Sequence, residues 1–113
     1  MANQVVVHEA LEPWLMGLAD SDWERVVAAV QALQDLGPAL RRPLVGTLTG
    51  SKFPNMRELR TGSIRILFIF DPDQDAILLV GGDKSEHGWS RWYAAAIPEA
   101  DARYEHYLSD KGD

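Results

Sequence analysis

The basic side chains of this 113-residue chain gather in one segment, although the formal net charge is -6. Residues 39–65 contain six arginines and lysines against a single acid, Glu58. A guanidinium group stays charged and binds phosphate oxygens in pairs, so clustered arginines are typical of a phosphate-binding surface. The alternative is a solvated basic patch balanced by acidic neighbours. The bases are Arg41, Arg42, Lys52, Arg57, Arg60 and Arg65.

Three of these arginines lie on a predicted β-hairpin, where side chains alternate between the two faces of the sheet. A two-residue turn at Thr61 and Gly62 would place Glu58 opposite Arg65, with Arg60 on the same face. An ordinary cross-strand ion pair with Glu58, contributing about 0.2–1 kcal/mol, would by itself explain Arg65. It would not explain the other cations nearby. The apolar face of the hairpin would carry Leu59, Ile64, Ile66, Phe68 and Phe70.

Further groups suited to nucleic-acid chemistry follow the hairpin. Lys84 ends the strand AILLVGGDK, and Trp92 and Tyr93 come a few residues later. Aromatic rings beside a basic surface can stack on bases. Core packing is the alternative interpretation for these rings, less so for Tyr93 with its polar hydroxyl.

The N-terminal third predicts one strand and two helices. Residues 4–8 are rich in valine and favour a strand, and Pro13 suits the first turn of a short helix that ends near Leu18. Ser21 and Glu24 have the spacing of a capping box, which predicts the start of a longer helix. Gly37 and Pro38 predict its end. The apolar stripe expected to face the core consists of Trp23, Val26, Val27, Val30 and Leu33.

The rest of the chain predicts an antiparallel meander and a C-terminal helix. Residues 39–55 are interrupted by proline and glycine, so we expect an irregular segment with at most a short strand. Strands are predicted at 56–60, 63–70 and 76–82. Pro98 predicts a short helical piece before it and the main helix after it. The element order indicates an α+β fold, with helices on one face of a mostly antiparallel sheet and the other face partly open.

Composition narrows the class of protein. The length is that of one domain, residues 1–113, with globular proportions of apolar and charged residues. The absence of cysteine excludes disulfides and thiol chemistry. The N-terminus has no secretory signal pattern and no apolar run reaches the about 20 residues that span a bilayer, so we expect a cytoplasmic protein without membrane contact. The three histidines lack metal-ligand spacing, and Gly82-Asp83-Lys84-Ser85 is not a phosphate-binding P-loop.

Four stretches of this chain resemble the RelE/ParE toxin superfamily, and most closely its HigB-like, phage-derived branch. They span about residues 36–108 and read LGPALRRPLVGTLTGSKFPNMRELR, IRILFIFDP, AILLVGGDKS and WYAAAIPEADARYEHYL. The resemblance implies a RelE-like fold and the toxin of a type II toxin–antitoxin pair. The implied partner is a cognate antitoxin, often a helix-turn-helix protein, which would also supply the only contact with operator DNA.

Members that resemble RelE and HigB cleave mRNA, usually at the ribosome, without a metal or another cofactor. This reaction is attack of a ribose 2′-OH on the adjacent phosphate, which requires proton transfer and stabilisation of negative charge. By this resemblance, Arg65 would hold the scissile phosphate, Arg60 would assist it, and Lys84 or Tyr93 would transfer protons. The predicted nucleic-acid-binding residues are Lys52, Arg57, Arg91 and Trp92.

Two other functions stay open at this stage. A ParE-like protein uses the same fold to poison DNA gyrase without hydrolysing anything. A weakly active toxin would act mainly in the antitoxin complex that represses its operon. The chain also departs from RelE-type nucleases, since Met56 and Glu58 stand on the face where those enzymes tend to carry lysines, and the overall acidity is unusual for a ribosome-targeted nuclease.

Overall fold

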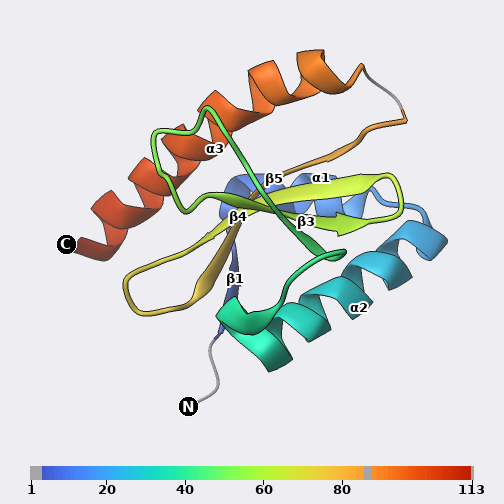
Figure 1. Ribbon diagram of the computed structural model, residues 1–113, viewed down its shortest axis with the longest axis horizontal. Coiled ribbons are helices and arrows are strands. Elements are labelled where there is room, and N and C mark those ends of the chain that lie inside the picture. The colour runs from blue at the N-terminus through green and yellow to red at the C-terminus, as the bar shows by residue number, and fades with distance from the viewer. Residues whose placement is uncertain (1–3, 86–87, 113) are drawn as a thin grey trace.

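The computed structural model describes residues 4–85 and 88–112 and contains one five-stranded sheet with helices on both of its faces (Figure 1). The strand order is β1-β5-β4-β3-β2. β1 pairs with β5 in parallel, and all other neighbours are antiparallel. The predicted meander and α+β class are therefore confirmed. The strands are β1 (Val5–Val7), β2 (Val45–Thr47), β3 (Arg57–Thr61), β4 (Ile64–Phe70) and β5 (Ala76–Asp83).

The helices flank the sheet in the order that the sequence predicts, with α1 and α2 after β1 and α3 at the end of the chain. Short 3-10 turns, η1 and η2, precede α1 and follow α2. The bounds are η1 (Glu9–Leu11), α1 (Glu12–Met16), α2 (Asp20–Leu36), η2 (Gly37–Ala39) and α3 (Trp89–Gly112). Among the described residues, no helix has an apolar run suited to crossing a bilayer.

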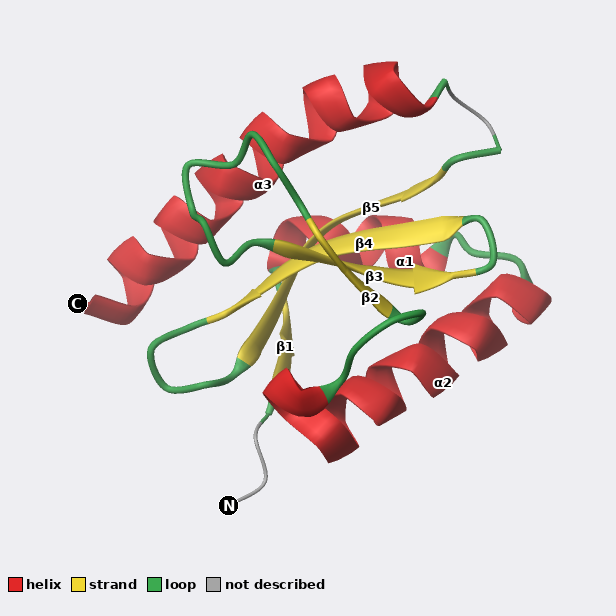
Figure 2. Cartoon of the chain, in the orientation of Figure 1, coloured by secondary structure: helices red, strands yellow, loops and turns green. Residues whose placement is uncertain are grey.

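α2 and α3 lie on opposite faces of the sheet (Figure 2). The expectation that all helices cover one face is wrong. Helices cover both faces because β4 and β5 are apolar on both faces, and each apolar face must be shielded from water. Ile66 and Phe68 belong to the core under α2, whereas Leu67 and Ile69 belong to the core under α3. At the β3–β4 hairpin the face on the α3 side is polar, and the candidate site lies there.

The start of α2 differs from the capping box predicted at Ser21. The helix begins at Asp20 after Ala19, no side chain caps it, and Ser21 lies inside its first turn. Asp20 and Asp22 place negative charge at this end, where the helix dipole favours it. The predicted end is confirmed, because Gly37 adopts a φ of 54° directly after Leu36.

The buried face of α2 is also rotated from the predicted stripe. Val26, Ala29 and Leu33 are buried, but Trp23 is 43% exposed and Val27 is 47% exposed. The i, i+3, i+4 pattern predicted five core residues on this helix, but only some of them face the sheet.

α3 runs without a break through Pro98, so the prediction of two helical pieces is wrong. Pro98 is exposed, as is Ala94 four residues earlier, whose carbonyl loses its helical donor. On this solvent-facing side, water can satisfy that carbonyl.

The β3–β4 hairpin turns at Gly62 and Ser63, one residue later than predicted. Gly62 has a φ of 59°, which glycine adopts without steric cost. Arg60 therefore pairs with Arg65, a shift of two residues from the predicted register. Because side chains alternate with a period of two, this shift preserves the predicted faces.

Candidate active site

A hollow of about 570 Å³ lies between the polar face of the β3–β4 hairpin and the first turns of α3. Arg60, Arg65, Lys84 and Tyr93, the four predicted catalytic residues, all line it. They come from β3, β4, the turn after β5, and α3. The fold thus brings together side chains from the β3–β4 hairpin, the end of β5 and the start of α3. The other lining residues are Thr47, Leu48, Thr49, Glu58 and Ile97.

Glu58 is at the centre of the polar groups in this hollow and is only 3% exposed. Its Oε2 accepts two hydrogen bonds from Arg60, from Nε at 3.1 Å and from Nη2 at 2.8 Å. Its Oε1 accepts a hydrogen bond from the Tyr93 hydroxyl and lies 3.9 Å from Arg65 Nε. One buried carboxylate therefore positions three of the four predicted catalytic side chains.

Arg65 is fixed by the turn of its own hairpin. Its Nη1 donates hydrogen bonds to the carbonyl oxygens of Gly62 at 2.8 Å and Ile64 at 2.9 Å, and its side chain is 10% exposed. Such bonds from a charged donor are stronger than neutral ones. The predicted ion pair with Glu58 is present, but as a diagonal contact, since Arg65 is paired with Arg60 across the strands.

Arg60 lies across the neighbouring edge strand at Gly46, which pairs with Glu58. A side chain at Gly46 would place a Cβ 2.6 Å from Arg60 Cζ and 2.8 Å from its Nε. The missing side chain therefore provides the space that Arg60 needs to reach Glu58. The Arg60 side chain is 36% exposed, against 10% for Arg65, so it is the more accessible of the two guanidinium groups.

Tyr93 and Trp92 fix the α3 side of the hollow. Burial, the hydrogen bond to Glu58 and the charge of Glu58 raise the pKa of the Tyr93 phenol, although Arg65 and Arg60 oppose this shift. Tyr93 is therefore a protonated donor at neutral pH. Trp92 packs against the backbone of Gly82, where a Cβ would lie 2.5 Å from Trp92 Cε2, and its ring is 5.0 Å from that of Tyr93.

Lys84 follows β5 directly and is anchored at the hairpin turn. Its backbone N–H donates to the carbonyl oxygen of Ser63 at 2.9 Å. This bond joins the end of β5 to the β3–β4 turn and places the lysine at the rim of the hollow that contains Arg65.

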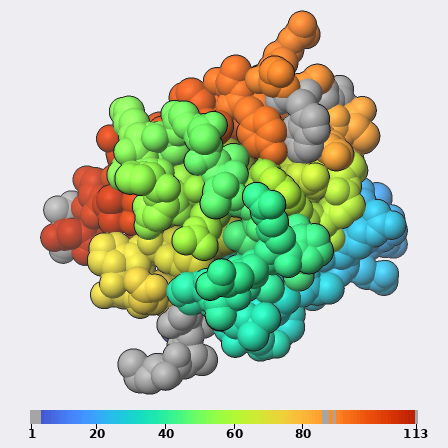
Figure 3. Space-filling model, viewed as in Figure 1, coloured from blue at the N-terminus to red at the C-terminus, as the bar shows by residue number. Residues whose placement is uncertain are grey.

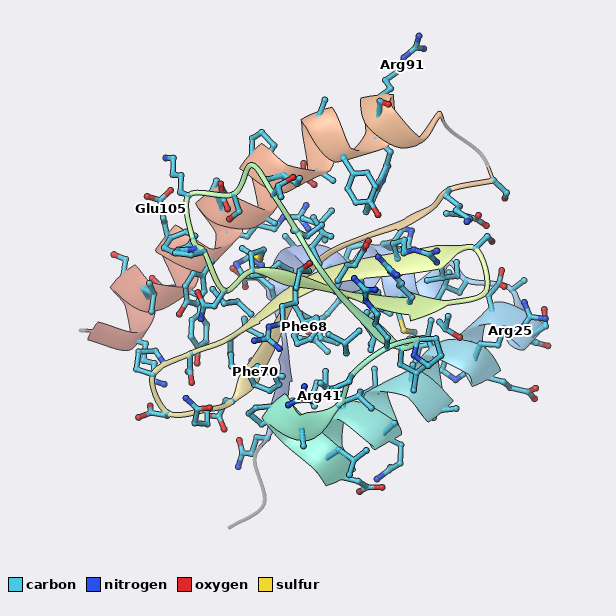
Figure 4. The ribbon with its side chains drawn as sticks, in the orientation of Figure 1. Arg25, Arg41, Phe68, Phe70, Arg91 and Glu105 are labelled. Atoms are coloured by element: carbon cyan, nitrogen blue, oxygen red, sulfur yellow. The ribbon has the colours of Figure 1, made fainter. Side chains whose placement is uncertain are left out.

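The four predicted nucleic-acid-binding residues do not share this hollow. Lys52 belongs to the loop between β2 and β3, and its Nζ lies 3.6 Å from Oε1 of Glu105 on α3. Arg91 points away from the sheet (Figure 4). Arg57 is on the opposite face of β3, in a separate groove. Trp92 packs beside Tyr93 in the core under α3.

The hollow combines acid–base groups with cations. It contains a carboxylate, a phenol, an ammonium group and two guanidinium groups, which together can bind a phosphate diester and move protons. Within residues 4–85 and 88–112, no three histidine, cysteine, aspartate or glutamate side chains are grouped so that they could hold a metal ion.

Two features of the site were not predicted from the sequence. They are the central position of Glu58 among the polar side chains and the requirement for glycine at position 46. Glu58 was considered only as an ion-pair partner of Arg65. Its isolation as the one acid among six bases in residues 39–65 is the signal that could have indicated a buried hub. Gly46 gave no comparable signal, because its contact with Arg60 depends on the register between β2 and β3.

Comparison with known proteins identifies the family. The family model described as "Phage derived protein Gp49-like (DUF891)" matches residues 13–105. The chain belongs to the Gp49-like family of phage-derived proteins. It is 44% identical over 109 residues to the Mycobacterium tuberculosis protein named "Putative toxin HigB3", covering 95% of both chains. It is 43% identical over 110 residues to "Putative toxin HigB2" of the same organism, covering 93% of this chain and 54% of that protein.

These relatives confirm the resemblance to the HigB-like, phage-derived branch that the sequence motifs predicted. The chain spans about half of HigB2 but nearly all of HigB3.

Solved structures confirm the RelE-like fold. A mutant of the Escherichia coli toxin RelE in the free state has a TM-score of 0.64 at 14% identity, covering 91% of this chain and 98% of that one. The RelE of the Pyrococcus horikoshii RelE–RelB complex has a TM-score of 0.63 at 19% identity, covering 77% and 100%. Because these identities are only 14% and 19%, the similarity to the two structures shows a shared fold and nothing further.

Proposed function

We propose that this Gp49-like protein is a metal-independent endoribonuclease that cleaves mRNA, at the ribosome, and so inhibits translation. The observation that carries this proposal is the arrangement around Glu58. Two arginines, a lysine, a tyrosine and a carboxylate line one hollow, and these are the groups that a phosphodiester cleavage needs. The kinship with HigB proteins supports the same activity.

In the proposed reaction, the ribose 2′ oxygen attacks the adjacent phosphorus and the bond from phosphorus to the 5′ oxygen breaks. Glu58 takes the proton of the 2′-OH, since it is the one carboxylate among the described residues that line the hollow. Lys84 gives a proton to the departing 5′ oxygen. The products are a 2′,3′-cyclic phosphate and a 5′-hydroxyl, and solvent restores both protonation states.

Arg65 and Arg60 stabilise the negative charge that develops on the phosphate oxygens in this proposal. Removing one preorganised donor of this kind costs about 100- to 1000-fold in rate. Tyr93, whose raised pKa keeps it protonated, donates to Glu58 and orients it rather than acting as the base.

A matched pair of lysine variants tests the proposal. Lys84→Met removes the ammonium group in the hollow, whereas Lys52→Met removes one that is paired with Glu105 outside it. In a purified translation system with a defined mRNA, loss of the proton donor should slow cleavage by about 100-fold or more. At saturating mRNA the Lys52 variant should cleave at the wild-type rate, since the role predicted for Lys52 is RNA binding and not proton transfer. Equal rates in both variants would contradict the assignment of Lys84.

The same cleavage assay, together with a test for DNA breaks in cells, separates the alternatives. A gyrase poison would leave the mRNA intact and break DNA in cells, and a weakly active toxin would leave both intact. We further propose that a cognate antitoxin, of the helix-turn-helix type, neutralises the protein and carries it to operator DNA. Its binding should suppress cleavage by the wild-type protein.

A further inference from the structure

A second basic groove, of about 460 Å³, lies at the β2 edge of the sheet. Arg41, Arg42 and Arg57 line it, and Leu40 and Val45 are the buried apolar residues beneath them. Arg57 reaches it because successive residues of β3 point to opposite faces, so that Arg57 and Glu58 diverge. The groove is thus distinct from the hollow around Glu58.

The three arginines of this groove are not neutralised within the described part of the chain. The ion pairs found in residues 4–85 and 88–112 involve other cations, and none joins a carboxylate to Arg41, Arg42 or Arg57. Like charges held together in a folded chain repel each other and reduce its stability. In a protein with a net charge of -6, this retained cluster indicates an anionic ligand.

The groove adjoins the hollow at the edge strand β2. Thr47 lines both, and Gly46 before it lines the groove while its missing side chain gives space to Arg60 in the hollow. β2 is the edge strand of the sheet, so the two depressions meet around this one strand. In the space-filling view, the teal and green atoms near residues 40–50 cover the front of the molecule beside α2 (Figure 3).

We propose that this groove binds the sugar–phosphate backbone of the same RNA strand whose cleavage we place in the hollow, at nucleotides beyond the cleaved bond. The proposal rests on the proposed function. A chain of phosphates that enters the hollow at Arg60 continues over Gly46 and Thr47 to the three arginines. Guanidinium groups bind phosphate oxygens bidentately without reading the base. An isolated acidic peptide would not need a groove that adjoins the hollow.

Binding can be measured without cleavage. The probe is a fluorescent, single-stranded RNA of about 12 nucleotides, within the usual site size for such strands, with 2′-O-methyl groups that prevent 2′ attack. Anisotropy titrations at several salt concentrations compare the wild type with Arg41→Gln/Arg42→Gln and with Arg57→Gln. Arg25→Gln is the matched control, since it removes one exposed positive charge on α2, beside Asp22. Urea unfolding checks that each variant is folded.

We expect the Arg41→Gln/Arg42→Gln variant to bind about tenfold more weakly, and Arg57→Gln several-fold more weakly. The slope of log K against log salt should become shallower by about 0.7 for each phosphate that the variant no longer neutralises. Arg25→Gln should leave affinity and slope unchanged.

Three outcomes would overturn the proposal. Groove variants that bind RNA as tightly as the wild type refute RNA binding in the groove and leave the proposed nuclease activity untouched. If the groove variants keep their affinity for RNA but lose affinity for the antitoxin, the ligand of the groove is a protein. A wild type that neither binds the probe nor cleaves mRNA in the purified translation system refutes RNA binding in the groove together with the proposed function.

Discussion

Replacing Gly46 by alanine is expected to displace Arg60 without removing any charge from the hollow. The new Cβ would lie 2.6 Å from Arg60 Cζ, well inside van der Waals contact, and the guanidinium group is the movable partner. Gly46 is not among the glycines with positive φ, so alanine suits its backbone. Arg60 should lose its two hydrogen bonds to Glu58 Oε2, at 3.1 Å and 2.8 Å.

The expected changes in stability and rate differ in size. Loss of two bonds from a partly exposed arginine costs about 1–2 kcal/mol, and the Gly→Ala change returns about 0.4–1 kcal/mol by restricting the unfolded chain. The free energy of unfolding should therefore fall by no more than about 1.6 kcal/mol. A displaced catalytic cation should slow cleavage by about 10- to 100-fold.

Urea unfolding and single-turnover cleavage of mRNA measure these two quantities. Gly17→Ala is the matched control, because its Cβ would meet only ordinary contacts, at 3.5 Å and 3.7 Å. The Gly46→Ala/Arg60→Ala double variant should cleave no more slowly than Arg60→Ala alone. Wild-type cleavage by Gly46→Ala, or fully additive effects in the double variant, would refute the role given to Arg60.

Three other substitutions have definite expected outcomes. Arg65→Ala should lower the free energy of unfolding by about 3 kcal/mol in urea titrations, since it leaves the carbonyl oxygens of Gly62 and Ile64 without this donor and Glu58 without one of its two guanidinium neighbours. A decrease under about 1 kcal/mol would contradict this structural role. Arg65→Lys should cleave about 100-fold more slowly. Burial alone would raise the pKa of the Asp71 carboxyl, but hydrogen bonds from Lys111, the Asp75 backbone and a tyrosine lower it below its ordinary 3.8. Its stabilising contribution is thus complete above about pH 4 and is lost as the pH falls through the folded value, so Asp71→Asn should flatten acid unfolding followed by circular dichroism in that range. Gly82→Ala should displace Trp92, costing about 1–3 kcal/mol and shifting tryptophan fluorescence, and an unchanged spectrum would refute the contact.

The faces of the hairpin could be predicted from the sequence, because alternation depends only on whether positions are odd or even. Arg60 and Arg65 stayed together although the turn moved to Gly62 and Ser63, since a shift of two residues preserves both faces. The pairing of Arg60 with Arg65 could not be predicted, because it depends on that turn.

Contacts between segments that are distant in the chain could not be predicted from the sequence. The hydrogen bond from Tyr93 to Glu58 joins residues 35 positions apart and requires α3 to cover the second face of the sheet. The sequence analysis placed all helices on one face, so it left Glu58 exposed beside an open surface. Pro98 had suggested a helix start there, but an exposed proline costs α3 only one hydrogen bond.

If the hollow cleaves RNA by attack of a 2′-OH, removing that one hydroxyl from the substrate must stop the reaction. After the wild-type cleavage site in an mRNA is mapped, the nucleotide that supplies the 2′-OH is replaced by its 2′-deoxy form, and the rate at that bond is measured. We expect cleavage at that bond to stop, while the unmodified mRNA gives 2′,3′-cyclic phosphate and 5′-hydroxyl ends. Cleavage of the 2′-deoxy bond at an undiminished rate would contradict attack by the 2′-OH.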